Sequence, residues 1–69
     1  MKRGILTKRE EEIFTLLVAG KTTKDIAAKL GISEKTVRNH ISNTIQKLEV
    51  KGRASAIVEL LKLGEISIY

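Results

Sequence analysis

Apolar residues recur along this chain at intervals of three and four, which is the period of a helix that buries one face. Four stretches show the pattern, and we predict helices at about residues 8–19, 23–30, 34–48 and 53–63. Proline is absent and only two residues are aromatic, a composition that disfavours a β-sandwich. A length of 69 residues suffices for one domain, so residues 1–69 are predicted to form a single all-α domain.

The first predicted helix carries a recognisable start signal. Thr7 and Glu10 have the spacing of a capping box, in which each side chain accepts a hydrogen bond from the other residue's backbone N–H. Gly20 is the expected end of this helix. The run from Glu10 to Glu12 lies in the first turns, where the helix dipole favours negative charge, so we expect a solvent-exposed face rather than catalytic carboxylates. We also expect an ion pair between Glu10 and Arg53 that ties the first helix to the fourth.

The second and third predicted helices are joined by a tight turn. Thr22 or Thr23 is expected to cap the second helix. Gly31 can take the left-handed conformation that ends this helix, and Ser33 can cap the next one. Two short helices joined by three or four residues that include Gly form the helix-turn-helix pattern, although many helical hairpins share it.

The third predicted helix is divided between an apolar stripe and a polar face. Its buried stripe is expected to consist of Val37, Ile41, Ile45 and Leu48. The opposite face is polar and contains no acid, and its members are Lys35, Thr36, Asn39, Ser42, Asn43 and Gln46. Arg38 and His40 lie at its margins. Thr, Asn and Ser are mediocre residues for an exposed helix, so a role other than helix stability is indicated.

The positive charge of the chain is concentrated in its middle. The net charge is +5, and residues 20–53 alone carry eight basic residues against three acidic ones, while the rest of the chain is balanced. Such a concentration is typical of a surface that binds a polyanion. A solvated basic face without a partner is the alternative explanation.

The composition disfavours several other functions. The chain has no Cys and one His, so a zinc site of the usual ligand type is not expected. We expect no other cofactor and no small-molecule ligand. The sequence shows no nucleophile–base constellation, so an enzyme is not expected. It also contains no apolar run of membrane-spanning length and no signal peptide, which favours a cytoplasmic protein without membrane contact.

The polar face of the third helix has the residues that base recognition requires. An α-helix fits the major groove of B-DNA, where Asn can pair with adenine and Arg with guanine. Carboxylates are unfavourable there because phosphates flank the groove. We expect the surrounding residues to contact phosphates, namely Lys24, the amides of Thr22 and Thr23, Lys35, Lys47 and Lys51.

Long stretches of the sequence resemble the LuxR-type helix-turn-helix family. The resemblance is carried by LTKREEEIF, DIAAKLGISEKTVRNHISN and KLEVKGR, and it covers about residues 5–66. It implies a four-helix DNA-binding domain that regulates transcription, reads the major groove with its third helix and dimerises through its fourth. Within the family, the chain is most similar to small free-standing regulators of late sporulation genes. Met1 and the extent of the likeness favour a complete protein over an excised domain.

The resemblance also assigns roles to individual residues of the third helix. The family's base-reading positions and the next turn are occupied by Arg38, Asn39, Ser42 and Asn43. Position 42 is Ser where some relatives carry a longer basic residue, so a direct base contact there is open. Thr36 is expected to reach the DNA backbone. His40 matches a common family histidine, with either a phosphate contact or a hydrogen bond inside the hairpin as its role.

The fourth predicted helix has more apolar surface than one core needs. Beside its core-facing residues it carries a second stripe of Ala54, Val58 and Leu61. The simplest partner for such a stripe is its symmetric copy in a homodimer. Two alternatives are that Ile66 and Ile68 of the tail cover the stripe, or that it binds another regulator or RNA polymerase.

Overall fold

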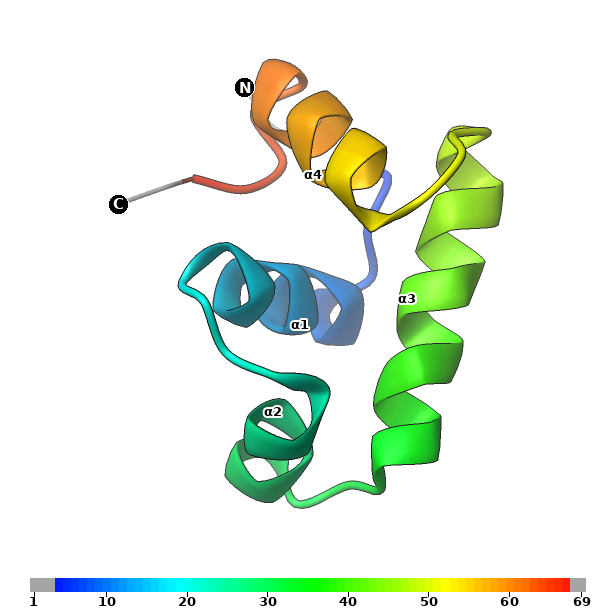
Figure 1. Cartoon of the computed structure of the whole chain (residues 1–69). Helices are drawn as coiled ribbons and strands as arrows, with labels where there is room; N and C mark the ends of the chain where they lie inside the picture. Colours follow the sequence, from blue (N-terminus) through cyan, green and yellow to red (C-terminus); the bar gives the residue numbers. More distant parts are fainter. Residues whose placement is uncertain (1–3, 68–69) are drawn as a thin grey trace.

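Residues 4–67 are described by the computed structural model of the chain, and every regular element among them is a helix. Their bounds are α1 Lys8–Val18, α2 Thr23–Leu30, α3 Glu34–Leu48 and α4 Arg53–Lys62 (Figure 1). The predicted all-α class and the predicted order of four helices are therefore confirmed. Only α1 and α4 differ from the prediction, since each ends one residue earlier.

Local hydrogen bonds explain where the helices begin and end. Thr7 and Glu10 form the predicted capping box at α1. Thr22, not Thr23, caps α2, and Asp25 completes a second capping box there. Gly31 ends α2 in the left-handed conformation with φ 71°, as predicted for the turn between α2 and α3. The helix-turn-helix pattern read from the sequence is thus present.

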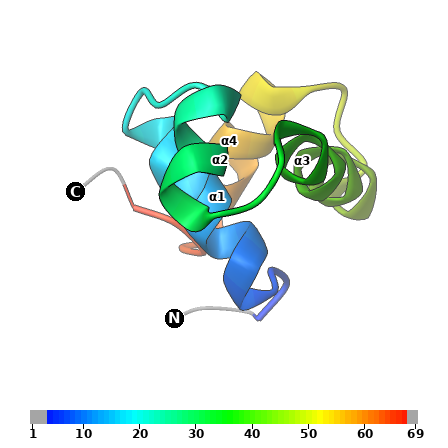
Figure 2. The same ribbon diagram turned by 90° about the horizontal axis from the view of Figure 1, so that it is seen from below.

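All four helices contribute to one core. Its fully buried apolar residues are Ile13 and Phe14 of α1, Ile26 of α2, Val37 of α3, and Ala56 and Leu60 of α4. α1 lies in the middle of the fold, and α3 packs along α1, α2 and α4 (Figure 1). Viewed nearly end-on, α3 stands to one side of the other three helices, so one long face of it points away from the body (Figure 2).

The segment after α4 folds back onto the body. Ile66 is 6% exposed and belongs to the core, and Glu65 is 2% exposed. The Glu65 carboxylate accepts a hydrogen bond from the Gly4 backbone N–H at 3.1 Å. Val58 nevertheless stays 52% exposed, so Ile66 does not cover that residue of the second stripe, and Ile68 lies outside the described residues.

Candidate nucleic-acid interface

The outward face of α3 is formed by the side chains that the sequence pattern placed there. Val37 and Ile41 are buried, and Ile45 and Leu48 are half-buried, which fixes the apolar stripe against the core. The exposed residues on the other side are Lys35, Arg38, Asn39, Ser42, Asn43 and Gln46. Thr36 and His40 are half-buried at the margin of this face. A helix of 15 residues thus presents amide, hydroxyl and basic groups to solvent along its length.

The first turn of α3 is held by hydroxyl groups. The Ser33 side chain accepts a hydrogen bond from the Thr36 backbone N–H at 3.0 Å. The two hydroxyl oxygens also lie 2.9 Å apart, within hydrogen-bond distance. Thr36 is therefore oriented by the cap before it meets any partner, an arrangement that sequence reasoning missed.

Arg38 has an acidic neighbour that sequence reasoning also missed. Its guanidinium lies 3.6 Å from the Glu34 carboxylate, one helical turn away. Both side chains are exposed, Arg38 by 54% and Glu34 by 45%. Exposed pairs of this kind are weak, so Arg38 can leave Glu34 for a stronger acceptor.

The start of α2 supplies a second set of predicted contacts. Lys24 is exposed and Thr23 is half-buried. The Thr22 backbone N–H donates to the Asp25 carboxylate at 3.3 Å, so this amide already has an acceptor within the cap. Hydrogen bonds from the backbone and side chain of Thr22, with attraction from nearby lysines, hold the pKa of Asp25 below its usual value. The carboxylate therefore remains an acceptor for the cap at neutral pH.

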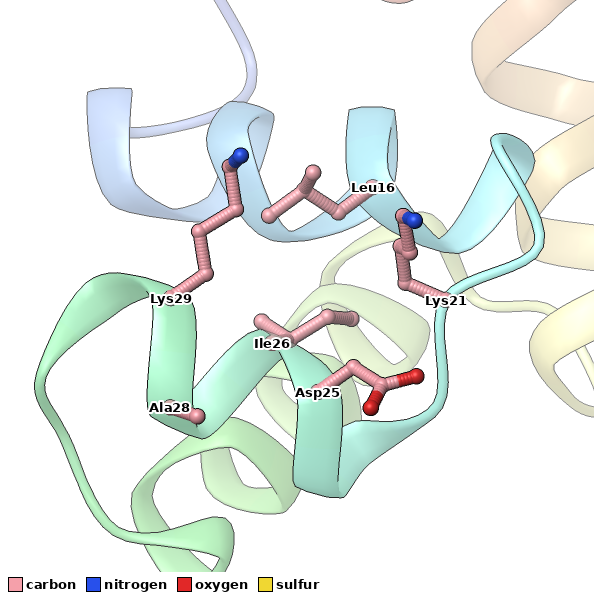
Figure 3. A pocket seen from close by; sticks show the side chains of 6 residues that line it. All are labelled: Leu16, Lys21, Asp25, Ile26, Ala28 and Lys29. Atoms are coloured by element: carbon pink, nitrogen blue, oxygen red, sulfur yellow. The ribbon is translucent and has the colours of Figure 1, made fainter.

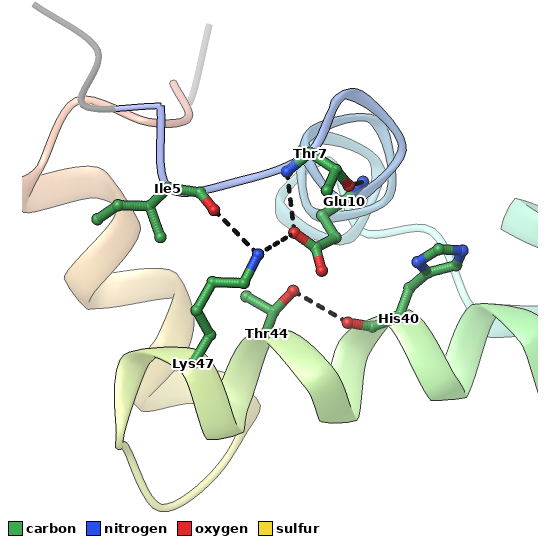
Figure 4. A network of polar contacts seen from close by, with 6 residues as sticks. All are labelled: Ile5, Thr7, Glu10, His40, Thr44 and Lys47. Atoms are coloured by element: carbon green, nitrogen blue, oxygen red, sulfur yellow. Dashed lines mark hydrogen bonds and ion pairs between the residues drawn. The ribbon is translucent and has the colours of Figure 1, made fainter.

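Lys47 faces the body of the protein. Its ammonium lies 2.6 Å from the Glu10 carboxylate and 2.9 Å from the Ile5 carbonyl oxygen (Figure 4). Glu10 is 4% exposed, so the expectation that it lies on a solvent-exposed face is wrong. The expected ion pair of Glu10 with Arg53 is also wrong, because within residues 4–67 the cation paired with Glu10 is Lys47. Lys51, the other predicted contact after α3, is exposed in the following loop.

Glu10 stays ionised in this environment. Burial raises the pKa of its carboxyl group, but hydrogen bonds from Lys47 and Thr7 and the Lys47 charge outweigh burial and leave the pKa below its ordinary value. Beside this pair, the Thr44 hydroxyl is fully buried and donates to the His40 carbonyl oxygen at 2.9 Å (Figure 4). Neither burial is visible in the polarity pattern, because both residues look polar in the sequence.

A shallow hollow lies where α1 meets α2. It has a volume of about 500 Å³ and is lined by Leu16, Lys21, Asp25, Ile26, Ala28 and Lys29 (Figure 3). Asp25 is committed to the cap of α2. Among residues 4–67, no three His, Cys, Asp or Glu side chains are grouped so that they could hold a metal ion. In the same range, no helix is both long and apolar enough to span a bilayer.

The geometry defines a class of protein. α2 and α3 form a helix-turn-helix, and α3 exposes a polar face with lysines around it. This arrangement is typical of DNA-binding domains. The chain belongs to the luxR family of bacterial regulatory proteins, whose sequence profile matches residues 4–60. It is accordingly a DNA-binding transcription regulator, as its sequence predicts.

Individual relatives differ in how much of their length this chain matches. The chain is 67% identical over 66 residues to the spore germination protein GerE of Bacillus subtilis (strain 168), covering 96% of this chain and 89% of GerE. It is also 45% identical over 64 residues to the transcriptional regulatory protein DegU of Brevibacillus brevis. That match covers 93% of this chain but only 27% of DegU, so it concerns one part of a longer regulator.

A solved structure agrees with the sequence comparison. The structure of the transcription factor GerE superposes on this chain with a TM-score of 0.94, at 67% identity. The superposition covers 97% of this chain and all of the solved chain. The likeness in sequence therefore extends to the arrangement of the helices.

Proposed function

We propose that this chain is a homodimeric regulator that recognises a specific DNA sequence by inserting α3 into the major groove. The observation that carries the proposal is the exposed face of α3, which bears two Asn residues one turn apart and no acid from residue 35 to residue 48. Asn39 and Asn43 can each pair with a base through an amide that both donates and accepts. An exposed helix selected for stability alone would favour Glu, Lys and Gln at such positions.

In this proposal some residues contact bases (the base readers) and others contact phosphates. Arg38 and Asn39 are the principal base readers, because both are exposed on the same stretch of α3. Ser42 and Asn43 follow one turn later and complete the reading face. The phosphate contacts are Lys24, the amide of Thr23, Lys35, Thr36, His40 and Lys51. The Thr22 amide was expected among them, and it is left out because it already donates to the Asp25 carboxylate. Lys47 was expected in the same group, but its ammonium contacts Glu10 and Ile5, so we leave it out of the phosphate contacts and propose a separate role for it.

The dimer interface in this proposal is the second apolar stripe of α4. Val58 is the one large apolar side chain of residues 4–67 that is plainly exposed, at 52%. Ala54 is exposed beside it and Leu61 is half-buried. A two-fold dimer through this stripe would place two copies of α3 on half-sites about 10 bp apart. Another protein, such as RNA polymerase, is the competing occupant of the stripe.

The relatives support a proposal for the biological process in which the protein acts. The similarity to the spore germination protein GerE supports a role in regulating sporulation genes. We place the protein in the cytoplasm as a single domain over residues 1–69, without cofactor, small-molecule ligand, catalytic activity or membrane contact. The GerE match, which extends over most of both proteins, supports this domain assignment.

Selection from a pool of random duplexes tests the proposal. We expect the pool to converge on a short motif, which footprinting should then show as two protected half-sites. A pool that never enriches would remove the sequence-specific role.

Asn39→Ala tests the reading face itself. The variant should lose about 1–3 kcal/mol of binding free energy on the selected duplex and relax the preference at one base pair. Kd values on the selected duplex, on its single-base variants and on a random duplex provide the measurement. Gln46→Ala, at an exposed position of α3 without an assigned contact, is the control. Equal losses on selected and random duplexes for Asn39→Ala would exclude its base-reading role.

A further inference from the structure

We propose that Lys47 and Glu10 act as a positioning pair that fixes α3 for base recognition, and that Lys47 does not bind a phosphate. This inference rests on the proposed function, since it concerns how specific binding is achieved. The pair joins the last turn of α3 to the first turn of α1 across 37 positions of sequence. A third member, the Ile5 carbonyl oxygen, adds the segment before α1 to the same junction.

The burial of Glu10 gives the pair its importance. The Glu10 side chain is 6% exposed, and a buried ionised carboxylate needs a partner that restores the interactions lost from water. One of its oxygens accepts from both Lys47 and the Thr7 backbone N–H. Lys47 therefore neutralises a charge that is built into the start of α1.

A phosphate contact by Lys47 would conflict with this arrangement. Two of the three donors of the ammonium group are engaged, by Glu10 and by Ile5. Turning toward DNA would remove the cation from Glu10 and leave a buried carboxylate without its charged partner. Lys35 and Lys47 are both exposed, but Lys35 lies on the outward face of α3 and has no such conflict. The two lysines of one helix are thus assigned different roles.

The pair lies where it can control the reading face. Asn43 precedes Lys47 by one helical turn, and the buried Thr44 lies between them with its hydroxyl bonded to the His40 carbonyl oxygen (Figure 4). A shift of the last turn of α3 relative to α1 would therefore displace Asn43 and, through the rigid helix, the readers that precede it. Base contacts depend on such displacements more than phosphate contacts do, because bidentate pairing fixes both distance and angle.

Salt dependence of DNA binding separates positioning from a phosphate contact. Each phosphate contact contributes about 0.9 to the slope of log K against log salt concentration. We expect Lys47→Met to weaken binding to the selected duplex roughly tenfold, to change random-duplex binding less than about twofold, and to leave the slope unchanged. Lys35→Met should weaken both duplexes alike and reduce the slope by about 0.9. Lys29→Met, on α2 beside the hollow, is the matched lysine control. It should change neither the affinity for the two duplexes nor the slope.

Glu10→Gln should change DNA affinity in opposite directions under the two possible roles of Lys47. In a positioning pair, it should reproduce the loss seen with Lys47→Met, and the double variant should be no worse than either single one. If Lys47 binds phosphate, Glu10→Gln releases the lysine and should instead tighten binding to every duplex with a steeper slope. Circular dichroism at the assay temperature corrects each Kd for the folded fraction, because a role in folding alone leaves the ratio of selected to random binding unchanged.

A measurement on the unaltered protein covers the case in which these variants do not fold. Nitrogen-15 NMR of the lysine ammonium groups, recorded with and without the selected duplex, should leave the Lys47 signal in place and shift that of Lys35. A Lys47 ammonium coupled to a DNA phosphorus nucleus would overturn the proposal. So would an unchanged ratio of selected to random binding in folded Lys47→Met. If the unaltered protein itself shows no preference between the duplexes, the proposed function fails, and the positioning role fails with it.

Discussion

Arg38 combines a predicted base-reading role with an acidic neighbour that must release it. The exposed Glu34 lies 3.6 Å from its guanidinium and adds negative charge at the edge of the reading face. Phosphates repel such a charge, so Glu34→Gln should tighten binding to all duplexes, by up to about 1 kcal/mol, with a steeper salt dependence. Fluorescence anisotropy at several salt concentrations measures both effects.

A matched ion pair on α1 serves as the control for Glu34. Arg9 and Glu12 lie 3.2 Å apart, each 40% exposed, and neither is assigned to the DNA surface. Glu12→Gln should therefore have a clearly smaller effect on DNA affinity than Glu34→Gln. Equal effects of the two substitutions would mean that net charge, and not the contact with Arg38, determines the result.

Glu10 gives the fold a dependence on acid. Its pKa lies below the ordinary value of 4.5, so ionised Glu10 stabilises the folded state above that pH. This contribution is lost as the pH falls from 4.5 through the lower folded-state pKa. Glu10→Gln should lower the free energy of unfolding by about 1–3 kcal/mol at pH 7, and the difference from the unaltered protein should narrow below pH 4.5. Urea denaturation at pH 7 and at lower pH measures it, and a difference that does not change with pH would contradict the assignment.

The end of α3 contains a strained residue. Glu49 has φ 56°, the left-handed conformation that Gly adopts without a steric penalty. Glu49→Gly should therefore stabilise the protein by up to about 1 kcal/mol, since relief of strain exceeds the added freedom of the unfolded chain. Thermal denaturation provides the measurement. Glu49→Gln removes the charge but keeps the strain, so an equal gain from that control would show that charge is the cause.

The elements themselves could be predicted because their signals are local. Thr7, Thr22 and Ser33 each cap a helix through a contact three residues away, and Gly31 turns the chain where it is needed. The apolar stripe of α3 follows from helical spacing alone. Contacts within five residues are readable in a sequence because no other part of the chain has to be placed first.

Long-range contacts of polar residues could not be predicted in this way. Glu65 meets Gly4 across 61 positions, and Lys47 meets Glu10 across 37. Lys47 lies at the margin of the apolar stripe of α3, where a small rotation decides between solvent and α1. The sequence-based expectation that Lys47 contacts a phosphate rested on its charge. Charge alone does not distinguish a lysine that contacts a phosphate from one that pairs with a buried carboxylate.

Val58, on the second apolar stripe of α4, is not covered by the other residues of the range 4–67. Val58 is 52% exposed on a helix whose opposite side already contributes Ala56 and Leu60 to the core. In a two-fold dimer, each copy of the stripe packs on the other, so the energy of association also sets the spacing of the two α3 helices. In the proposed dimer, DNA recognition and self-association would then depend on the same residue, although Val58 is not one of the proposed base readers.

Val58→Lys tests that dependence. Because the side chain is exposed, the fold and the melting temperature should change little, whereas two facing lysines would repel across a dimer axis. Sedimentation should show a monomer, and the footprint on the selected duplex should shrink to separate half-site binding. The control is Val58→Ile, which keeps the apolar surface. If Val58→Lys still self-associates but no longer activates or represses a reporter, the stripe binds another protein, and dimerisation must use a different face.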